Sequence, residues 1–131
     1  MRTIETPRAP LPAGHYSQAV VFGGLVWVAG QLPHDPADPG RAPGDAEAQT
    51  ERALRNVEEI LEAAGSGLDR LLSVTVYVAD VALWPRVNAA YARVLGSHRP
   101  ARAVVPVKEL HHGYLVEVQA VAALREPAEP E

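Results

Sequence analysis

The sequence predicts an α+β fold in which two helices cover one face of a mixed β-sheet. Two segments repeat apolar residues with the helical period, and the other apolar segments are short and rich in β-branched residues. The order along the chain is a hairpin, a helix, a strand, a helix and two further strands. This order, in a chain of 131 residues, indicates one layered domain.

The N-terminal third is predicted to hold a loop, a β-hairpin and a second loop. Residues 6–16 are rich in Pro, Ala and Gly and form the first loop. Gln18 to Phe22 pairs with Leu25 to Ala29, because a Gly-Gly dipeptide between short apolar runs favours a two-residue hairpin turn. Residues 32–44 contain four prolines, which exclude a helix or a regular strand.

Two amphipathic helices are predicted. The first starts at Asp45, with Asp45 or Gly44 as its N-cap, and Gly65 ends it in the left-handed conformation. The second runs from about Leu83 to Leu95, with Pro85 in the first turn, where proline is tolerated. The apolar face of the first helix comprises Ala46, Ala53, Leu54, Val57, Ile60, Leu61 and Ala64.

The last three predicted strands point to a function. Leu71–Val78 is β-branched, whereas Arg102 opens the strand 102–107 and Glu117 lies inside the strand 114–122. An ionised carboxylate among valines is costly to bury unless it has a partner or a task. A strand-borne arginine offers a rigid fork that suits a carboxylate. The pair therefore predicts a small-molecule site that binds an acid.

Both faces of the predicted strands are apolar. In the last strand Val116 and Val118 share one face, and Leu115 and Val121 share the other face with Glu117. Two helices can cover only one face of such a sheet. We therefore expect a second subunit to cover the other face, and the protein to be an oligomer.

The composition excludes several classes of function. A net charge of -4 and a pI of about 5.7 argue against a nucleic-acid partner. The chain has no cysteine, which removes disulfides, thiolate catalysis and Cys-ligated metals. The N-terminus lacks an apolar signal region, and no apolar run reaches the roughly 20 residues of a membrane helix. We expect a soluble, cytoplasmic protein with no membrane partner and a disordered C-terminal tail at residues 125–131.

Short segments along residues 2–124 are similar to those of one known family. Residues 13–18 (Ala-Gly-His-Tyr-Ser-Gln) resemble its Gly-Pro-Tyr-x-Gln segment, and residues 28–33 (Val-Ala-Gly-Gln-Leu-Pro) resemble its Ser-Gly-Gln-Ile-Pro segment. Residues 100–102 (Pro-Ala-Arg) match a signature of the family, residues 116–118 match its glutamate strand, and residues 49–65 and 87–91 match its helices. The chain resembles the Rid (YjgF) family of enamine/imine deaminases.

The resemblance implies a chorismate-mutase-like (bacillus-type) fold: a mixed six-stranded sheet with two helices on one face, assembled into a barrel-like homotrimer with sites between subunits. One domain would span residues 1–124. Family members hydrolyse reactive 2-enamine and 2-imine acids, such as 2-aminoacrylate, to 2-oxo acids and ammonia without a cofactor. The resemblance therefore implies a cofactor-independent deaminase whose substrate carries a carboxylate.

The resemblance also assigns roles to single residues. Arg102 would clamp the substrate carboxylate, Glu117 would hold the attacking water, and Tyr16 would line the pocket and donate a hydrogen bond. Asn88 would lie close to the site. The alternatives are a structural ion pair for Arg102, a cross-strand partner or solvent for Glu117, plain packing for Tyr16 and a polar helix surface for Asn88.

Substrate contacts are also expected from the backbone around Gly30 and Gln31 and at Val104. Two positions depart from the family pattern. Ala29 replaces a serine, which removes a hydroxyl from the expected site and makes room for a larger substrate side chain. Val104 replaces a cysteine that contributes mainly backbone contacts, so we expect this change to be mild.

The histidines have no assigned role. His111 and His112 are predicted to lie in a surface turn with no metal, and His34 lies in a loop that borders the cleft or is simply exposed. The protein could bind a small acidic metabolite, or serve a biosynthetic pathway, without general deaminase activity, which Ala29 favours. A ribonuclease is disfavoured by the acidic pI.

Overall fold

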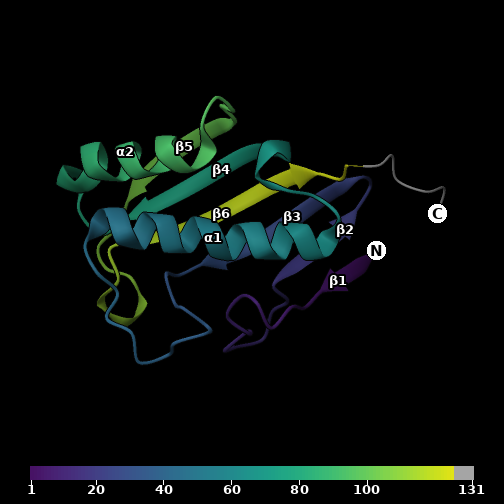
Figure 1. Cartoon of the computed structure of the whole chain (residues 1–131), viewed down its shortest axis with the longest axis horizontal. Coiled ribbons are helices and arrows are strands. Elements are labelled where there is room, and N and C mark those ends of the chain that lie inside the picture. The colour runs from purple at the N-terminus through teal and green to yellow at the C-terminus, as the bar shows by residue number, and fades with distance from the viewer. Residues whose placement is uncertain (126–131) are drawn as a thin grey trace.

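The structure is a computed structural model that describes residues 1–125, and it contains a six-stranded mixed sheet with two α-helices on one face (Figure 1). The helices are α1 (Ala46–Ala64) and α2 (Trp84–Leu95). The strands are β1 (Arg2–Ile4), β2 (Ala19–Phe22), β3 (Leu25–Gln31), β4 (Leu71–Val78), β5 (Ala101–Pro106) and β6 (Val116–Ala123). They lie in the order β1-β2-β3-β6-β4-β5, with β4 and β5 parallel and the other pairs antiparallel.

The ends of α1 follow from local chemistry, as the sequence predicts. Oδ1 of Asp45 accepts a hydrogen bond from the N–H of Ala48 at 2.9 Å, which satisfies one of the unpaired donors in the first turn. Gly65 ends the helix with φ at 87°, a value that costs an L-residue energy but costs glycine none. Helix α1 therefore begins after its N-cap, Asp45, and ends at its C-cap, Gly65.

The core lies between the helices and one face of the sheet. Leu54, Val57, Ile60 and Leu61 of α1 are completely buried. Full burial of one such side chain contributes about 1.5–3 kcal/mol. Facing them across the core are Val26, Val28, Val74, Val76, Val78, Val116, Val118, Ala120 and Ala122. The predicted helix-covered face is confirmed.

The structure differs from the prediction at the strand ends. The sequence did not predict β1, because three residues are too few to show an alternation of apolar and polar side chains. Only Ile4 of this strand is buried. β6 begins at Val116, not at residue 114, because the preceding 3₁₀ turn (His111–Gly113) leads the chain in from another direction. The N–H of Leu115 donates to Oε1 of Gln49 at 2.8 Å, and this contact with α1 replaces a strand partner.

The opposite face of the sheet carries large apolar side chains without a cover. Phe22 is paired with Leu25, and both share a face with Trp27. Phe22 is 58% exposed and Trp27 is 52% exposed. We call this surface of the sheet, away from the helices, the open face.

Two findings bear on the ends of the chain and on membranes. The predicted disordered tail lies outside the described residues except for Arg125, whose guanidinium pairs with the carboxylate of Asp69 at 2.7 Å. The N–H of Arg125 also donates to the carbonyl of Gly65 at 3.0 Å. Among residues 1–125, neither helix is long and apolar enough to cross a membrane.

Candidate active site

Arg102 lies on β5, at the edge of the sheet, and faces α2. Its Nη1 donates a hydrogen bond to Oδ1 of Asn88 at 2.8 Å, and its guanidinium carbon lies 4.7 Å from the centroid of the Tyr91 ring. A hydrogen bond donated to an amide oxygen and a cation–π contact hold a guanidinium without neutralising it. Within residues 1–125 no ion pair involves Arg102, so the structural ion pair does not account for it.

A cavity of about 400 Å³ opens beside this arginine. Its wall includes Asn88, Tyr91, His98, Pro100 and Arg102. The hydroxyl of Tyr91 is buried and has no hydrogen-bond partner among the described residues. Burial raises the pKa of Tyr91, and the nearby charge of Arg102 opposes that rise in part. Tyr91 is thus a protonated phenol beneath the guanidinium.

Glu117 lies on β6 and points away from Arg102. Residues that pair across strands share a face, and Arg102 pairs with Val74 while Glu117 pairs with Tyr77. Val74 and Tyr77 are three positions apart on β4, so their side chains lie on opposite faces. Arg102 therefore lies on the helix-covered face of the sheet, and Glu117 lies on the open face.

Gly30 makes room for the carboxylate of Glu117. The register of β3 and β6 shifts between Val28 and Gln31, which is the mark of a β-bulge. A Cβ added at Gly30 would clash with Oε2 of Glu117 and lie 3.1 Å from its Cδ. Glycine at this bulge lets the carboxylate pack against the backbone, and no ion pair holds Glu117 within residues 1–125.

The backbone next to the bulge is fixed by two hydrogen bonds at Ala29. The N–H of Ala29 donates to the carbonyl of Gln18 at 2.9 Å, and Nε2 of Gln31 donates to the carbonyl of Ala29 at 3.2 Å. Gln31 is buried and Ala29 is half-buried. Val104, two residues after Arg102 on the same face, packs against the core, and its strand is an edge strand, so some of its backbone groups lack a strand partner.

Tyr16 lines a second cavity, of about 360 Å³, that also contacts Gly30 and Gln31. The Tyr16 ring is 53% exposed, and its oxygen accepts a hydrogen bond from the N–H of Ala13 at 3.3 Å. The hydroxyl proton stays available to another acceptor. Plain packing therefore does not describe this tyrosine.

His34, His111 and His112 form a wall of this second cavity. The sequence left open that the His34 loop borders the cleft, but it indicated only a surface turn for His111 and His112. The hydroxyl of Tyr114 is hydrogen-bonded to Nδ1 of His34 at 2.8 Å across 80 positions of sequence, and the rings of His34 and His112 meet edge to face at 5.2 Å. Burial and the neighbouring His112 lower the pKa of His34. No spacing in the sequence indicates this group, because only the fold joins the two loops.

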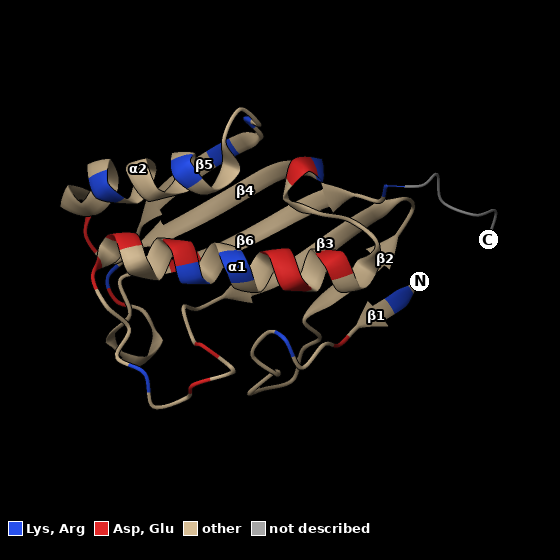
Figure 2. Cartoon of the chain, in the orientation of Figure 1, with Lys and Arg blue, Asp and Glu red and all other residues tan. Residues whose placement is uncertain are grey.

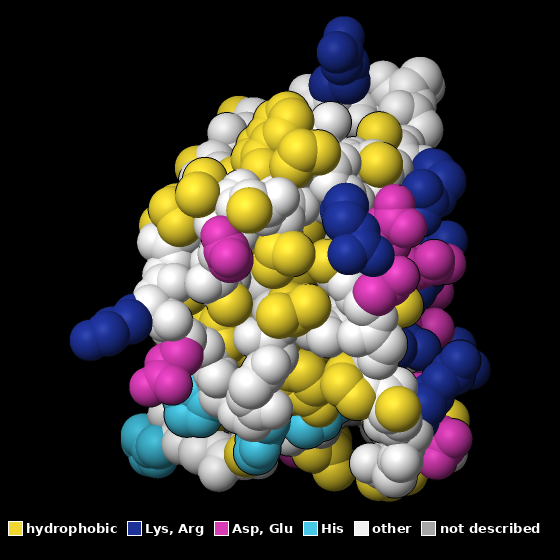
Figure 3. Space-filling model, turned by 90° about the vertical axis from the view of Figure 1, so that its left-hand side faces the viewer, with side chains coloured by type: hydrophobic (Ala, Val, Ile, Leu, Met, Phe, Trp, Pro, Cys, Tyr) yellow, Lys and Arg dark blue, Asp and Glu magenta, His cyan; other side chains and the backbone are white. Residues whose placement is uncertain are grey.

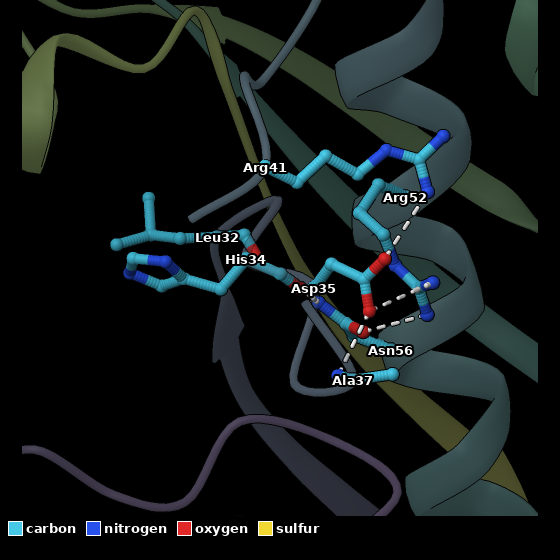
Figure 4. Close-up of polar contacts among 7 residues, drawn as sticks. All are labelled: Leu32, His34, Asp35, Ala37, Arg41, Arg52 and Asn56. Carbon is cyan, nitrogen blue, oxygen red and sulfur yellow. Dashed lines mark hydrogen bonds and ion pairs between the residues drawn. The ribbon is translucent and has the colours of Figure 1, made fainter. Parts of the chain in front are cut away.

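The loop that carries His34 is fixed to α1 (Figure 4). Nδ2 of Asn56 donates to the carbonyls of Leu32 and His34 at 3.0 Å and 2.8 Å. Asp35 lies 3.3 Å from Arg41 and 3.9 Å from Arg52. The N–H of Ala37 is the main cause that lowers the pKa of Asp35, and both arginines add to it. These contacts hold His34 in place at the cavity wall.

The predicted site residues fall into two separate groups in one chain. Arg102, Asn88 and Val104 lie on the helix-covered face, whereas Glu117, Gly30 and Tyr16 lie at or beside the open face. Among residues 1–125, no cluster of three His, Cys, Asp or Glu side chains is arranged to hold a metal ion.

Comparisons with known proteins match this architecture. The model of the family described as endoribonuclease L-PSP matches residues 6–124. A 2-iminobutanoate/2-iminopropanoate deaminase of Capra hircus is 39% identical over 121 residues, which cover 92% of this chain and 88% of that protein. The crystal structure of the YjgF gene product of E. coli is 36% identical, with a TM-score of 0.90 and coverage of 95% of this chain and 100% of that chain.

A structure of E. coli TdcF with bound serine is 32% identical, with a TM-score of 0.88 and coverage of 94% of this chain and 98% of that chain. The similarities extend over nearly the whole chain in both sequence and fold. The chain therefore belongs to the endoribonuclease L-PSP family, which is the YjgF/Rid family that its sequence resembles.

Proposed function

We propose that this protein hydrolyses 2-imino acids to 2-oxo acids and ammonia. The observation that carries the proposal is Arg102, a guanidinium held by Asn88 and Tyr91 but not neutralised by a carboxylate. A guanidinium in that state binds a carboxylate through two parallel hydrogen bonds. The deaminase name of the Capra hircus relative supports the reaction, and the serine in E. coli TdcF carries a carboxylate next to a nitrogen-bearing carbon.

The chemistry needs a positioned water and a proton carrier. Water adds to the carbon of the C=N bond, the C–N bond then breaks, and ammonia leaves as the carbonyl forms. Glu117 accepts a proton from the attacking water and passes it to the imine nitrogen, and the hydroxyl proton of the adduct then follows the same route to the departing nitrogen as the carbonyl forms. Arg102 fixes the carboxylate so that the imine carbon faces this water, and the hydroxyl of Tyr16 donates to substrate or water.

The complete site requires more than one copy of the chain. Because Arg102 and Glu117 lie on opposite faces of one sheet, a single chain cannot present both to one small substrate. The open face carries Trp27 and Phe22 exposed by more than half, which is the kind of surface that a second subunit buries. We propose a homotrimer in which Arg102 of one subunit approaches Glu117 of its neighbour.

A binding protein without general deaminase activity is the second candidate. Ala29 favours it, because the side chain offers no hydroxyl where family members carry serine. An RNA substrate is not favoured, despite the word endoribonuclease in the family's description. The net charge is -4, and α1 carries acidic residues at both ends with its two arginines between them, so it forms no basic face (Figure 2).

The test uses 2-aminoacrylate released by a serine dehydratase, with semicarbazide to trap the imine. We expect the full-length protein to compete with the trap and to speed the formation of pyruvate. Arg102→Ala should reduce this activity at least about a hundredfold, since it removes a bidentate charged contact. Arg93→Ala is the matched control, because Arg93 is an exposed arginine of α2 whose ion pair with Glu47 is long, at 3.9 Å.

Equal trapping with and without the folded wild-type oligomer would reject the deaminase and favour the binding protein. Full activity in Arg102→Ala would reject the role of the arginine. Sedimentation of each variant separates loss of chemistry from loss of assembly.

A further inference from the structure

The histidine wall of the Tyr16 cavity is the largest feature of the site that the proposed reaction does not use. His34 comes from the loop after β3, and His111 and His112 come from the 3₁₀ turn before β6. Ring centroids of His34, His112 and Tyr114 lie 5.0–5.9 Å apart. The histidine side chains gather at the lower end of the surface shown in Figure 3.

His112 is held in a backbone conformation that residues other than glycine adopt infrequently. It is the one residue other than glycine with a positive φ among residues 1–125, with φ at 60° and ψ at 17°. The left-handed region crowds the Cβ of an L-residue, so glycine or asparagine is the usual occupant. Strain of this kind is retained where a side chain must be aimed at a site, and here it places the imidazole against His34.

The wall presents imidazole ring nitrogens to the cavity and no carboxylate. The bond between Tyr114 and Nδ1 of His34 leaves Nε2 of that ring available, and the ring nitrogens of His111 and His112 form no hydrogen bond within residues 1–125. None of the residues that line the cavity is Asp or Glu. Imidazole N–H groups donate hydrogen bonds that suit a carboxylate.

The position of the wall relates it to the reacting end of the substrate. Gly30 lines the same cavity, and the carboxylate of Glu117 packs directly against Gly30. The same cavity thus joins the position of Glu117 to the histidines, and it offers space for the side chain of a ligand whose imine carbon faces Glu117. Arg102 is not part of this cavity, so the wall can serve a second group of the substrate, separate from the 2-carboxylate.

We propose that His34 and His112 form a side-chain subsite that selects 2-imino acids with a carboxylate in the side chain. The subsite rests on the proposed function for the reaction, but it predicts ligand binding that can be measured without turnover. Tyr114 acts as a positioning residue, because it fixes the His34 ring and does not itself line the cavity.

The experiment compares a dicarboxylic and a monocarboxylic imine in the full-length oligomer. Flavin oxidases acting on aspartate and alanine generate 2-iminosuccinate and 2-iminopropanoate in the assay mixture. Semicarbazide traps the imine that the protein does not hydrolyse. We expect His112→Gly to lower kcat/KM for 2-iminosuccinate about tenfold and to leave that for 2-iminopropanoate unchanged. The glycine suits the positive φ, so the variant should fold. His15→Ala, which removes an exposed histidine outside the cavity lining, should change neither value.

A second measurement separates the subsite from the reaction. Oxaloacetate and pyruvate, the two products, are titrated into the wild-type protein while the histidine ring resonances are followed by NMR. Oxaloacetate should shift His34 and His112, and pyruvate should not, even if neither imine is hydrolysed. Equal shifts by both acids, or equal losses of activity on both imines in His112→Gly, would overturn the subsite. Absence of all turnover together with selective shifts by oxaloacetate would overturn the deaminase alone.

Discussion

The two faces of the sheet differ in what covers them and in what they do. On the helix-covered face, Val74, Val76 and Val118 are essentially inaccessible, and the stripe of α1 closes over them. On the open face, Trp27 and Phe22 keep more than half of their surface exposed. One face accounts for the stability of the single chain, and the other keeps apolar surface that the single chain does not bury.

The candidate site follows the same division. Arg102 is positioned by α2 on the covered face, where Asn88 and Tyr91 fix its direction. Glu117 is positioned on the open face by a bulge and a glycine. The candidate catalytic residues are therefore divided between the face that packs the core of the single chain and the face that we propose forms the subunit interface.

The largest expected effect tests the covered face. Leu54→Ala removes a side chain that is completely buried between α1 and the sheet, so the free energy of unfolding should fall by about 2–5 kcal/mol. Urea denaturation at several protein concentrations measures this loss. A loss that disappears at high protein concentration would show that assembly, and not this core, holds the chain together.

The open face should respond differently. Trp27→Ala should weaken association about tenfold to a hundredfold, since it removes a large aromatic side chain from the proposed interface. Sedimentation across a range of concentrations would show the oligomer dissociating earlier than that of the wild type. An unchanged oligomer would show that the interface lies elsewhere on the molecule. The open face would then not be the surface that assembles the subunits.

Gly30→Ala tests the bulge that joins the open face to the site. The added methyl group would clash with Oε2 of Glu117, so the carboxylate must move and turnover of 2-iminopropanoate should fall about tenfold. Gly40→Ala is the matched control, because a Cβ there has no neighbour within 4 Å. Full activity in Gly30→Ala would mean that the position of Glu117 does not limit the reaction.

The smallest effect concerns the loops at the end of the open face. The pKa of His34 should lie below its ordinary value of 6.5, because burial and His112 both disfavour the charged ring. The other titratable groups near this ring are His111, Tyr16, Tyr114 and Asp35, the last paired with arginines. His112→Gly removes one of the two causes, so the pKa should rise towards 6.5.

An NMR titration of the histidine ring protons measures this change. Since the folded protein binds the proton at His34 more weakly than the unfolded chain, the neutral ring favours the fold above pH 6.5, and this contribution is lost as the pH falls below that value. A pKa of His34 that does not respond to His112→Gly would show that the two rings do not interact.

Local patterns were enough to predict most of the elements. The cap at Asp45, the turn at Gly23 and Gly24 and the stripe of α1 depend on neighbours a few residues away, and the structure confirms each of them. β1 was missed because a strand of three residues becomes a strand only by pairing with β2. The sequence did not place Arg102 and Glu117 on particular faces of the sheet; the strand register places them on opposite faces, so they do not meet within one chain.

The sequence by itself determined the candidate residues for the site: an arginine and a glutamate on apolar strands, and a tyrosine in a proline-rich loop. It also determined the alternation of side chains that marks two apolar faces of the sheet. Alternation has a period of two residues, so it is local and can be identified without the fold. The tertiary structure decided how these parts combine, because strand register and loop contacts depend on residues far apart in the chain. Only the fold brings Gly30 against Glu117, and Tyr114 against His34 across 80 positions.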